Sequence, residues 1–304
     1  MRRVIAALAA ILLLLPFFAS PYITALLLLI FMYITLAESW NILSGYTGYV
    51  SFGHVAFFGI GAYTAALLIT QKAFPWILAS LLGGIVAVLF AGVIGFICLR
   101  LRGPYFAIAL LGLNEAIKVI ATAWESLTRG GYGISLPPVP DLRSIYYAML
   151  LSATAVVLLT YRLASSKFGL RFLAIREDEI GAEGIGINTT RYKHAAFILS
   201  SFFPGVVGGV YAYYLSYIEP ESVFSVSITV KMIVMSMFGG AGTVLGPVIG
   251  AASLALVSEL FWAKFPYLHQ VMFGALIVAV VLFIPGGVVA LLQERNILPR
   301  SRRV

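Results

Sequence analysis

The side chains that could take part in chemistry are few, and most of them stand inside long apolar runs. Glu115 and Lys118 have the i,i+3 spacing at which opposite charges meet on a helix, so we predict that they neutralise each other. His54 stands alone beside a glycine-rich stretch, where a histidine is expected to be a hydrogen-bonded packing residue. Lys231 has no local partner and is expected to pair across helices or to extend its amine towards water.

Sequence motifs for nucleotide, metal or protease chemistry are absent. There is no Gly-x-x-x-x-Gly-Lys-Ser/Thr loop to hold phosphates and no His-Glu-x-x-His pair to bind zinc. The single cysteine, Cys98, has no second cysteine with which to form a disulfide or a metal site, so it is expected to be a packing residue. We therefore expect a protein that is not an enzyme and that needs neither a cofactor nor a metal.

The elements that position these side chains must lie in a membrane, because the chain is too apolar for a soluble fold. Of its 304 residues, 61% are hydrophobic and 11% are charged, and the mean hydropathy is +1.01. Soluble domains carry about 25% charged residues. The net charge of +8 could indicate a nucleic-acid partner. However, the basic residues lie between apolar runs and not on one amphipathic face, so they indicate topology instead.

A helix needs about 20 apolar residues to cross the hydrocarbon core of a bilayer. The apolar runs lie near residues 4–19, 22–42, 54–71, 75–99, 104–122, 145–163, 194–217, 227–240, 244–262 and 267–289. The eighth is short enough to be re-entrant. The prediction is an all-α polytopic membrane protein with about 8–10 transmembrane helices, some of them glycine-interrupted or re-entrant, in a single domain over residues 1–304. The first run also resembles a signal peptide, so cleavage of residues 1–20 is an alternative.

The positive charges then assign the two sides of the membrane, because cytoplasmic loops are enriched in Lys and Arg. With the N-terminus inside, 14 of the 20 basic residues are cytoplasmic, namely Arg2, Arg3, Arg100, Arg102, Arg162, Lys167, Arg171, Arg176, Arg191, Lys193, Arg295, Arg300, Arg302 and Arg303. We expect both termini inside, a basic cytoplasmic tail at 291–304, and a main outer loop at 123–144 without a long helix. Glu38 and Asn41 end the second run, near the expected inner interface.

Two glycine-rich stretches interrupt the apolar runs in a similar way, "SGYTGYVSFGHVAFFGIGAY" (44–63) and "FGGAGTVLGPVIGA" (238–251). Helices that break at corresponding places in two halves often line a transport path. Small residues can equally serve close helix packing, and both interpretations stay open. The candidate path residues are Gly45, Gly48, Gly53, His54, Gly239, Gly240, Gly242 and Gly246.

The longest polar stretch, "RFLAIREDEIGAEGIGINTTRYKHA" (171–195), falls on the predicted cytoplasmic side. Apolar and small residues interrupt its charges. The pattern predicts a short helix at about 168–178, then a glycine-rich turn and a second short piece. Such a mixture is typical of a surface on which a soluble partner docks, and a plain solvated loop is the alternative.

Three segments together resemble one known family. "RFLAIREDEIGAEGIGINTTRYKHAAFILS" (171–200) resembles the EAA-type cytoplasmic coupling loop of ABC-transporter permeases. "SWNILSGYTGYVSFGHVAFFGIGAYTAALL" (39–68) and "FPGVVGGVYAYYLSYIEPESVFSVSITVKMIVMSMFGGAGTVLGPVIGA" (203–251) resemble permeases of branched-chain amino-acid importers, the LivM-like subunits. The likeness extends from about residue 35 to residue 290. The family's Glu-Asn-Glu and Ala-Ala-Glu are replaced here by Glu177-Asp178-Glu179 and Gly181-Ala182-Glu183, which keeps the last glutamate.

The resemblance implies an inner-membrane permease subunit that forms a pore with a second, homologous permease subunit. It implies two ABC ATPase subunits docked on the inner face, a periplasmic or extracellular substrate-binding protein, surrounding membrane lipid, and import of branched-chain or similarly apolar amino acids. The implied ATPase-coupling residues within 168–190 are Gly169, Leu170, Arg171, Ala174, Ile175, Arg176, Glu177, Ala182, Glu183, Gly186 and Ile187. We expect Ala182, Glu183 and Gly186 to lie near the centre of that contact.

Two alternatives remain at this stage. Related permeases of the same family carry urea or amides, so the sequence does not fix the substrate. An ion-coupled secondary amino-acid transporter would need paired carboxylates deep in the bundle, and Glu115, the one candidate, has Lys118 beside it.

Overall fold

The computed structural model describes residues 2–264, 271, 274–275, 278 and 286–295. Its helices are α1 (Arg2–Phe18), α2 (Pro21–Trp40), η1 (Asn41–Gly45), α3 (His54–Lys72), α4 (Trp76–Cys98), α5 (Pro104–Ala123), α6 (Glu125–Thr128), η2 (Gly130–Tyr132), α7 (Leu142–Ala164), α8 (Lys167–Glu177), α9 (Glu179–Gly184), α10 (Thr189–Leu215), α11 (Pro220–Val223), α12 (Val226–Gly239), α13 (Leu245–Lys264) and α15 (Gly287–Glu294). Its strands are β1 (Ile134–Ser135) and β2 (Tyr217–Ile218).

Seven helical segments among the described residues are long and apolar enough to span a membrane, which confirms the predicted multi-span fold. They are Pro21–Gly45, His54–Lys72, Trp76–Cys98, Pro104–Ala123, Leu142–Ala164, Thr189–Leu215 and Pro220–Gly239. The predicted first run forms α1, which has 17 residues. The predicted ninth run forms α13, with a shorter apolar stretch at Leu245–Phe261. The tenth run and the basic tail lie mostly outside the described residues.

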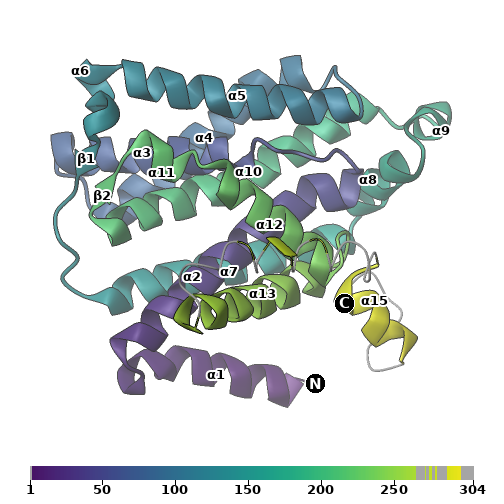
Figure 1. Cartoon of the computed structure of the whole chain (residues 1–304). Coiled ribbons are helices and arrows are strands. Elements are labelled where there is room, and N and C mark those ends of the chain that lie inside the picture. Colours follow the sequence, from purple (N-terminus) through teal and green to yellow (C-terminus); the bar gives the residue numbers. More distant parts are fainter. Residues whose placement is uncertain (1, 265–270, 272–273, 276–277, 279–285, 296–304) are drawn as a thin grey trace.

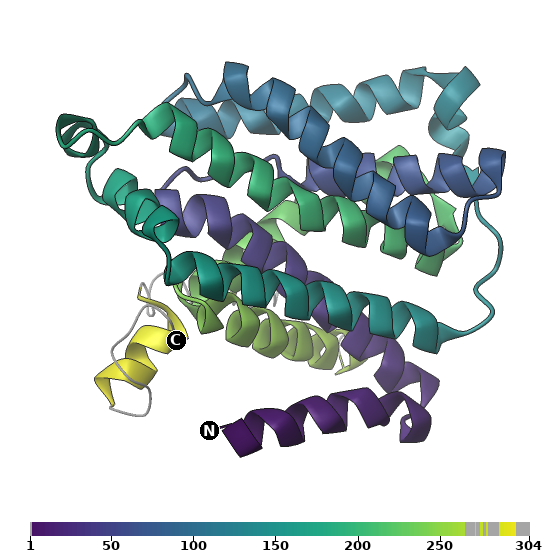
Figure 2. The ribbon, with the colours of Figure 1, turned by 180° about the vertical axis from the view of Figure 1, so that it is seen from behind.

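The long helices run along one common direction, so the molecule has two distinct ends (Figure 1). One end carries α8, α9, α15 and the start of α1, and the other carries α6, β1 and β2. Figure 2 shows the same separation from behind, with α10 crossing the middle of the bundle. Gly61 of α3 and Gly205 of α10 permit this packing, because a Cβ on Gly61 would fall on the Gly205 backbone. Small residues let helix backbones approach closely in this way.

The predicted outer loop at 123–144 contains no long helix, as expected. It holds the short helices α6 and η2, and then β1, which pairs antiparallel with β2 through Ile134 opposite Ile218 and Ser135 opposite Tyr217. This ladder of two-residue strands is a small addition to the helical fold. Strands of two residues are too short to show an alternating sequence pattern.

Local capping explains where the elements of the polar stretch begin. Ser166 accepts a hydrogen bond from the Gly169 amide at the start of α8, and Asn188 accepts one from Arg191 at the start of α10. Asp178 likewise caps α9 by accepting from the Ile180 amide. The predicted helix at about 168–178 is therefore confirmed as α8. The small residues expected to form a turn extend α9 to Gly184 instead, and the turn follows at Gly186, which has a φ of 85°.

Candidate functional site

Residues 168–190 are predicted to couple the chain to an ATPase, and we call them the coupling segment. They lie at one end of the bundle, where α8 and α9 project beyond the long helices (Figure 1). Phe172 and Ile175 are 1% and 3% exposed, so the inner side of α8 is packed against the protein. Gly169 lies under the end of α7, since a Cβ there would fall on the Leu163 carbonyl. This face of the segment is fixed by close packing.

The predicted coupling residues divide according to their exposure. Gly169, Ile175 and Ala182 are buried, Arg171, Ala174 and Ile187 are half-buried, and Leu170, Arg176, Glu177, Glu183 and Gly186 are exposed. Ala182 was expected to lie near the centre of a partner contact, and that contact stays a prediction. Its side chain is 4% exposed because α9 turns that face towards the protein.

Three apolar side chains stand out on the outer side of the coupling segment. Leu170 is 64% exposed, Ile180 is 70% exposed and Ile185 is 76% exposed. They lie on the short helices at the end of the bundle or on the turn that follows, and not along the apolar spans. Apolar side chains that are exposed on a polar segment are typical of a protein-interaction surface. We call these three residues the exposed apolar face.

Arg176, which was expected to contact a partner, directs its guanidinium into its own chain. Nη1 donates a hydrogen bond to the Gly45 carbonyl oxygen at 2.6 Å. A Cβ on Gly242 would fall on the same guanidinium, so Arg176 lies against both glycine-rich stretches at once. Its aliphatic stem packs on Gly48, where a Cβ would lie 3.3 Å from the Arg176 Cγ. We call residues 45–53 the first glycine break and residues 239–246 the second.

Asn41 begins η1, which leads into the first glycine break, and its side chain contacts the second break. Its Nδ2 donates to the Thr243 carbonyl oxygen at 2.8 Å, and its Oδ1 accepts from the Gly242 amide at 2.7 Å. Asn41 Nδ2 also lies 3.5 Å from Glu38 Oε2. Glu38 is 0% exposed, so it lies inside the bundle. The side-chain amide of Asn41 thus donates one hydrogen bond to the second break and accepts one from it, as a backbone peptide group does between paired strands.

A second connection ties α9 to the first glycine break and to α10. Tyr49 Oη donates to Glu179 Oε2 at 2.6 Å, and Lys193 Nζ donates to Glu179 Oε1 at 2.7 Å. Lys193 Nζ also donates to Tyr49 Oη at 2.9 Å, which closes a three-membered network. Arg102 lies at 3.7 Å from the same carboxylate and is largely exposed, so it adds little.

The charge state of this network follows from its surroundings. Burial raises the pKa of the Glu179 carboxyl, but hydrogen bonds from Lys193 and Tyr49, together with the nearby positive charges, outweigh burial and hold that pKa below its ordinary value. Burial, followed by the hydrogen bond to Glu179, raises the pKa of the Tyr49 hydroxyl above its ordinary value. Glu179 therefore stays ionised and Tyr49 stays a neutral donor. The contacts of Tyr49 and the Glu179–Lys193 pair follow no helical spacing, so no pattern in the sequence predicts them.

The remaining candidate path residues are closely packed. His54 is 0% exposed and its Nδ1 lies 2.8 Å from Ser51 Oγ, which confirms a hydrogen-bonded packing role. A Cβ on Gly53 would lie 2.9 Å from the Leu110 carbonyl, and one on Gly239 would fall on the Gly246 backbone. Close packing therefore accounts for these glycines within the chain. A role in lining a path stays a prediction.

Comparisons with known proteins place this arrangement in a family. A family profile described as the permease component of branched-chain amino acid transport systems matches residues 22–281. The chain belongs to this permease family. It is therefore a multi-pass membrane subunit of the ABC branched-chain amino acid importer family and is not the catalytic subunit.

Several curated relatives of the permease are transport permeases. The LivM high-affinity branched-chain amino acid permeases of Salmonella typhimurium and Escherichia coli are 29% and 28% identical to it, each over 92% of this chain and 73% of the relative. The autoinducer 2 import permease LsrC of Salmonella typhi is 29% identical over 71% of this chain and 64% of the relative. No solved structure matches the chain.

The intramembrane charges of the permease fit the predicted structural roles. Lys118 Nζ lies 2.8 Å from Glu115 Oε2, which confirms the predicted pair, and 3.5 Å from Glu221 Oε2. The Glu115 side chain is 42% exposed, so it is not the deeply buried carboxylate that an ion-coupled transporter would need. Lys231 extends across to α2, with its Nζ 5.9 Å from the centre of the Tyr33 ring.

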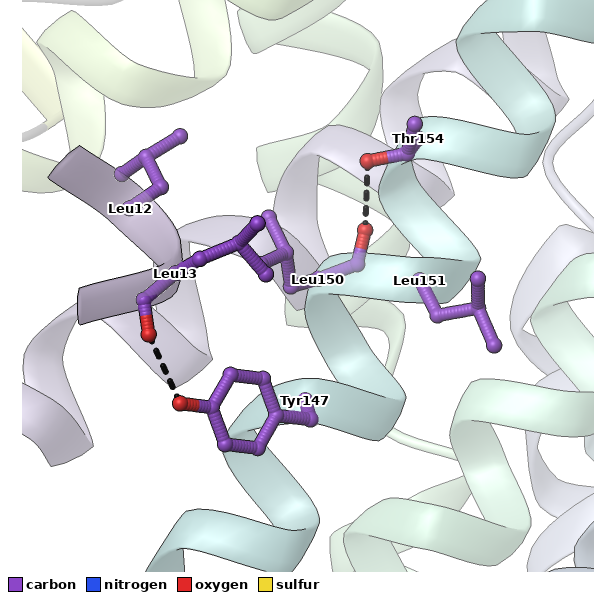
Figure 3. A pocket seen from close by; sticks show the side chains of 6 residues that line it. All are labelled: Leu12, Leu13, Tyr147, Leu150, Leu151 and Thr154. Carbon is purple, nitrogen blue, oxygen red and sulfur yellow. Dashed lines mark hydrogen bonds between the residues drawn. The ribbon is translucent and has the colours of Figure 1, made fainter. Parts of the chain in front are cut away.

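The permease also has an apolar groove of about 460 Å³ between α1 and α7 (Figure 3). It is lined by Leu12, Leu13, Tyr147, Leu150, Leu151 and Thr154. The Tyr147 hydroxyl donates to the Leu13 carbonyl at 2.7 Å and the Thr154 hydroxyl donates to the Leu150 carbonyl at 2.8 Å. The lining thus offers no charge to an amino acid's ammonium or carboxylate group. It suits a hydrocarbon chain, and we do not assign it as the transport site.

Proposed function

We propose that the permease imports branched-chain or similarly apolar amino acids across the inner membrane, as one of two permease subunits in an ATP-driven complex. The names of the two LivM relatives, each similar over 92% of this chain, support this substrate class. The proposal adds two ATPase subunits on the cytoplasmic side and a binding protein on the outer side. Membrane lipid surrounds the complex.

The observation that carries the proposal is the exposed apolar face of the coupling segment. Leu170, Ile180 and Ile185 expose apolar surface where water would otherwise contact it, and their burial against an ATPase subunit would be favourable. Glu183, at the edge of this surface, accepts a hydrogen bond from the Thr189 hydroxyl at 2.6 Å and so helps to fix the turn before α10. A docking surface held in this way can transmit the movement of a partner to the rest of the chain.

The orientation of the permease rests on its charge distribution. The end that carries α8 and α9 also carries the start of α1 and α15 (Figure 1). The predicted cytoplasmic residues Lys167, Arg171 and Arg176 belong to α8. A reporter fused after Lys167 is expected to be cytoplasmic, and one fused after Gly131 is expected to be external. Opposite reporter activities would show that this end is external, so that an ATPase could not dock there.

At the opposite end, the outer loop and the β1–β2 ladder form a surface that suits a binding protein. Tyr132 is 87% exposed there, and the Glu221 side chain is 78% exposed. Aromatic side chains are enriched at protein interfaces, and an exposed carboxylate can complement a basic surface on a partner. A basic patch on the binding protein would meet Glu221 and its neighbour Glu219.

The test compares a double variant of the exposed apolar face with two controls. Leu170→Ser with Ile185→Ser is expected to insert normally, to copurify far less ATPase and to lose ATP-driven uptake. Tyr132→Ser, at the other end, and Thr190→Ala, at the edge of the coupling segment, should copurify normal amounts of ATPase. Normal copurification and uptake by the double variant would show that the segment is only a solvated loop.

The substrate is tested separately in the wild-type complex, by uptake of labelled leucine with competitors in excess. Isoleucine and valine are expected to compete, whereas urea and acetamide are not. Autoinducer 2 is included because the LsrC relative is as similar in sequence as the LivM relatives, although over less of the chain. If autoinducer 2 alone competes, the proposed substrate class is wrong, while the proposed ATP-driven mechanism is unaffected.

A further inference from the structure

Arg176 occupies a position between two helix ends that come from different halves of the chain. The α2–η1 helix ends at Gly45, whose carbonyl oxygen accepts from Arg176 Nη1 at 2.6 Å. The α12 helix ends at Gly239, and Gly242, just beyond it, lies against the same guanidinium. The last carbonyls of a helix lack intrahelical partners and carry partial negative charge. The Arg176 guanidinium satisfies the Gly45 carbonyl at the end of η1 and lies against Gly242, just beyond the end of α12.

The two helix ends are joined to each other independently of Arg176. Asn41, in η1, holds Gly242 and Thr243 through two hydrogen bonds of 2.7 and 2.8 Å. The π-helical geometry of η1, which is rare and often found at functional sites, puts Asn41 at the point where α2 changes its winding. A displacement of either glycine break is therefore passed to the other through Asn41.

The path from the coupling segment to the spans is short and continuous. Arg176 belongs to the last turn of α8, and Leu170 of the exposed apolar face lies on the same helix. The Arg176 stem also rests on Gly48, so α8 contacts the first break through both its carbon chain and its charge. A movement of α8 thus reaches the ends of α2 and α12 without an intervening flexible loop.

We propose that Arg176 and Asn41 form a transmission joint, in which Arg176 carries the movement of α8 to both glycine breaks and Asn41 makes the two breaks move together. The joint rests on the proposed ATP-driven function and assigns Arg176 to coupling inside the chain, not to ATPase docking. Arg176 is a positioning residue here, because it acts on transport through the helix ends that it holds.

The first experiment needs no partner subunit and measures hydrogen exchange of the purified permease. Arg176→Met keeps most of the carbon stem and removes the guanidinium. Exchange is expected to rise at residues 45–48 and 240–244 while the amides of α4 and α10 stay protected. Arg162→Met, an exposed arginine at the end of α7, is the matched control and should change neither segment. Unchanged exchange at both breaks in Arg176→Met would overturn the joint.

The second experiment uses the assembled complex in proteoliposomes and compares ATPase recovery with leucine uptake. Arg176→Met should recover as much ATPase as the wild type and lose about tenfold in uptake, the factor expected from a lost charge-assisted hydrogen bond. Arg176→Lys, which keeps the cation, should regain part of the uptake. Leu170→Ser should lose ATPase and uptake together.

The outcomes separate the two proposals. Parallel loss of ATPase recovery and uptake in Arg176→Met would make Arg176 a docking residue and overturn the joint, as would normal uptake. A wild-type complex that recovers no ATPase would refute the proposed function, and hydrogen exchange would then decide on the joint alone.

Discussion

In the first glycine break, Gly48 and Tyr49 contact the coupling segment, whereas in the second break Gly239 and Gly246 contact each other across a helix hairpin. A Cβ on Gly48 would meet the flexible Arg176 stem at 3.3 Å, while one on Gly239 would fall on the Gly246 backbone. Similar glycine spacing thus serves two purposes. Gly239 and Gly246 of the second break let two helices fold against each other, whereas Gly48 of the first break lets α8 rest on the spans.

The strongest way to test this difference is Gly239→Leu in the second break. The new side chain would overlap backbone that cannot move aside, and overpacking costs roughly 1–3 kcal/mol even where neighbours can adjust. We expect little folded protein, measured as yield in the membrane and as thermal unfolding in detergent. Gly112→Leu is the control, because a Cβ there meets nothing within 4 Å. Equal stability of the two variants would contradict backbone contact at the second break.

The next test removes the charge that fixes Tyr49 of the first break. Lys193→Met leaves Glu179 without its main partner, and breaking a buried pair in this way costs roughly 3 kcal/mol. Thermal unfolding should show the loss, and adding Glu179→Gln should recover much of it, since no unpaired charge then remains. Lys167→Met, an exposed lysine of α8, should have almost no effect. Equal unfolding temperatures for the two lysine variants would show that this network does not stabilise the first break.

Gly48→Leu separates folding from coupling within the first break. Gly48 has a φ of 77°, and a left-handed backbone costs a residue with a side chain about 1–2 kcal/mol. The variant should insert, keep its ATPase and lose uptake, because the side chain displaces Arg176. Gly103→Leu is the matched control, with a φ of 58° and nothing within 4 Å of its Cβ. Equal uptake by both variants would show that only backbone strain matters.

The smallest expected effect is a pH dependence that belongs to the first break alone. The folded-state pKa of Glu179 is lowered, so its contribution to stability is present above the unfolded pKa of about 4.3 and is lost as the pH falls through the folded value. The difference in unfolding temperature between wild type and Glu179→Gln should be present at pH 7 and should shrink below about pH 4. A difference that stays constant over this range would mean that Glu179 does not act through its charge.

The sequence by itself determined which segments span the membrane and which segment lies at the end of the bundle. Apolar runs and capping residues such as Ser166 and Asn188 act over a few residues, so their effect can be recognised locally. The spacing of Glu115 and Lys118 determined their pairing for the same reason. The family likeness of the coupling segment could also be recognised from its residues, although not the direction in which each side chain points.

Only the tertiary structure decided how the candidate residues are used. Exposure divided the coupling residues, so that Ala182 is buried while Leu170 remains available to a partner. The hydrogen bond to Gly45 directs the exposed Arg176 into its own chain. The contacts that define the joint connect residues far apart in sequence, Asn41 with Gly242 and Arg176 with Gly45. Such pairs leave no periodic signal, because their geometry depends on how whole helices pack and not on the spacing of neighbouring residues.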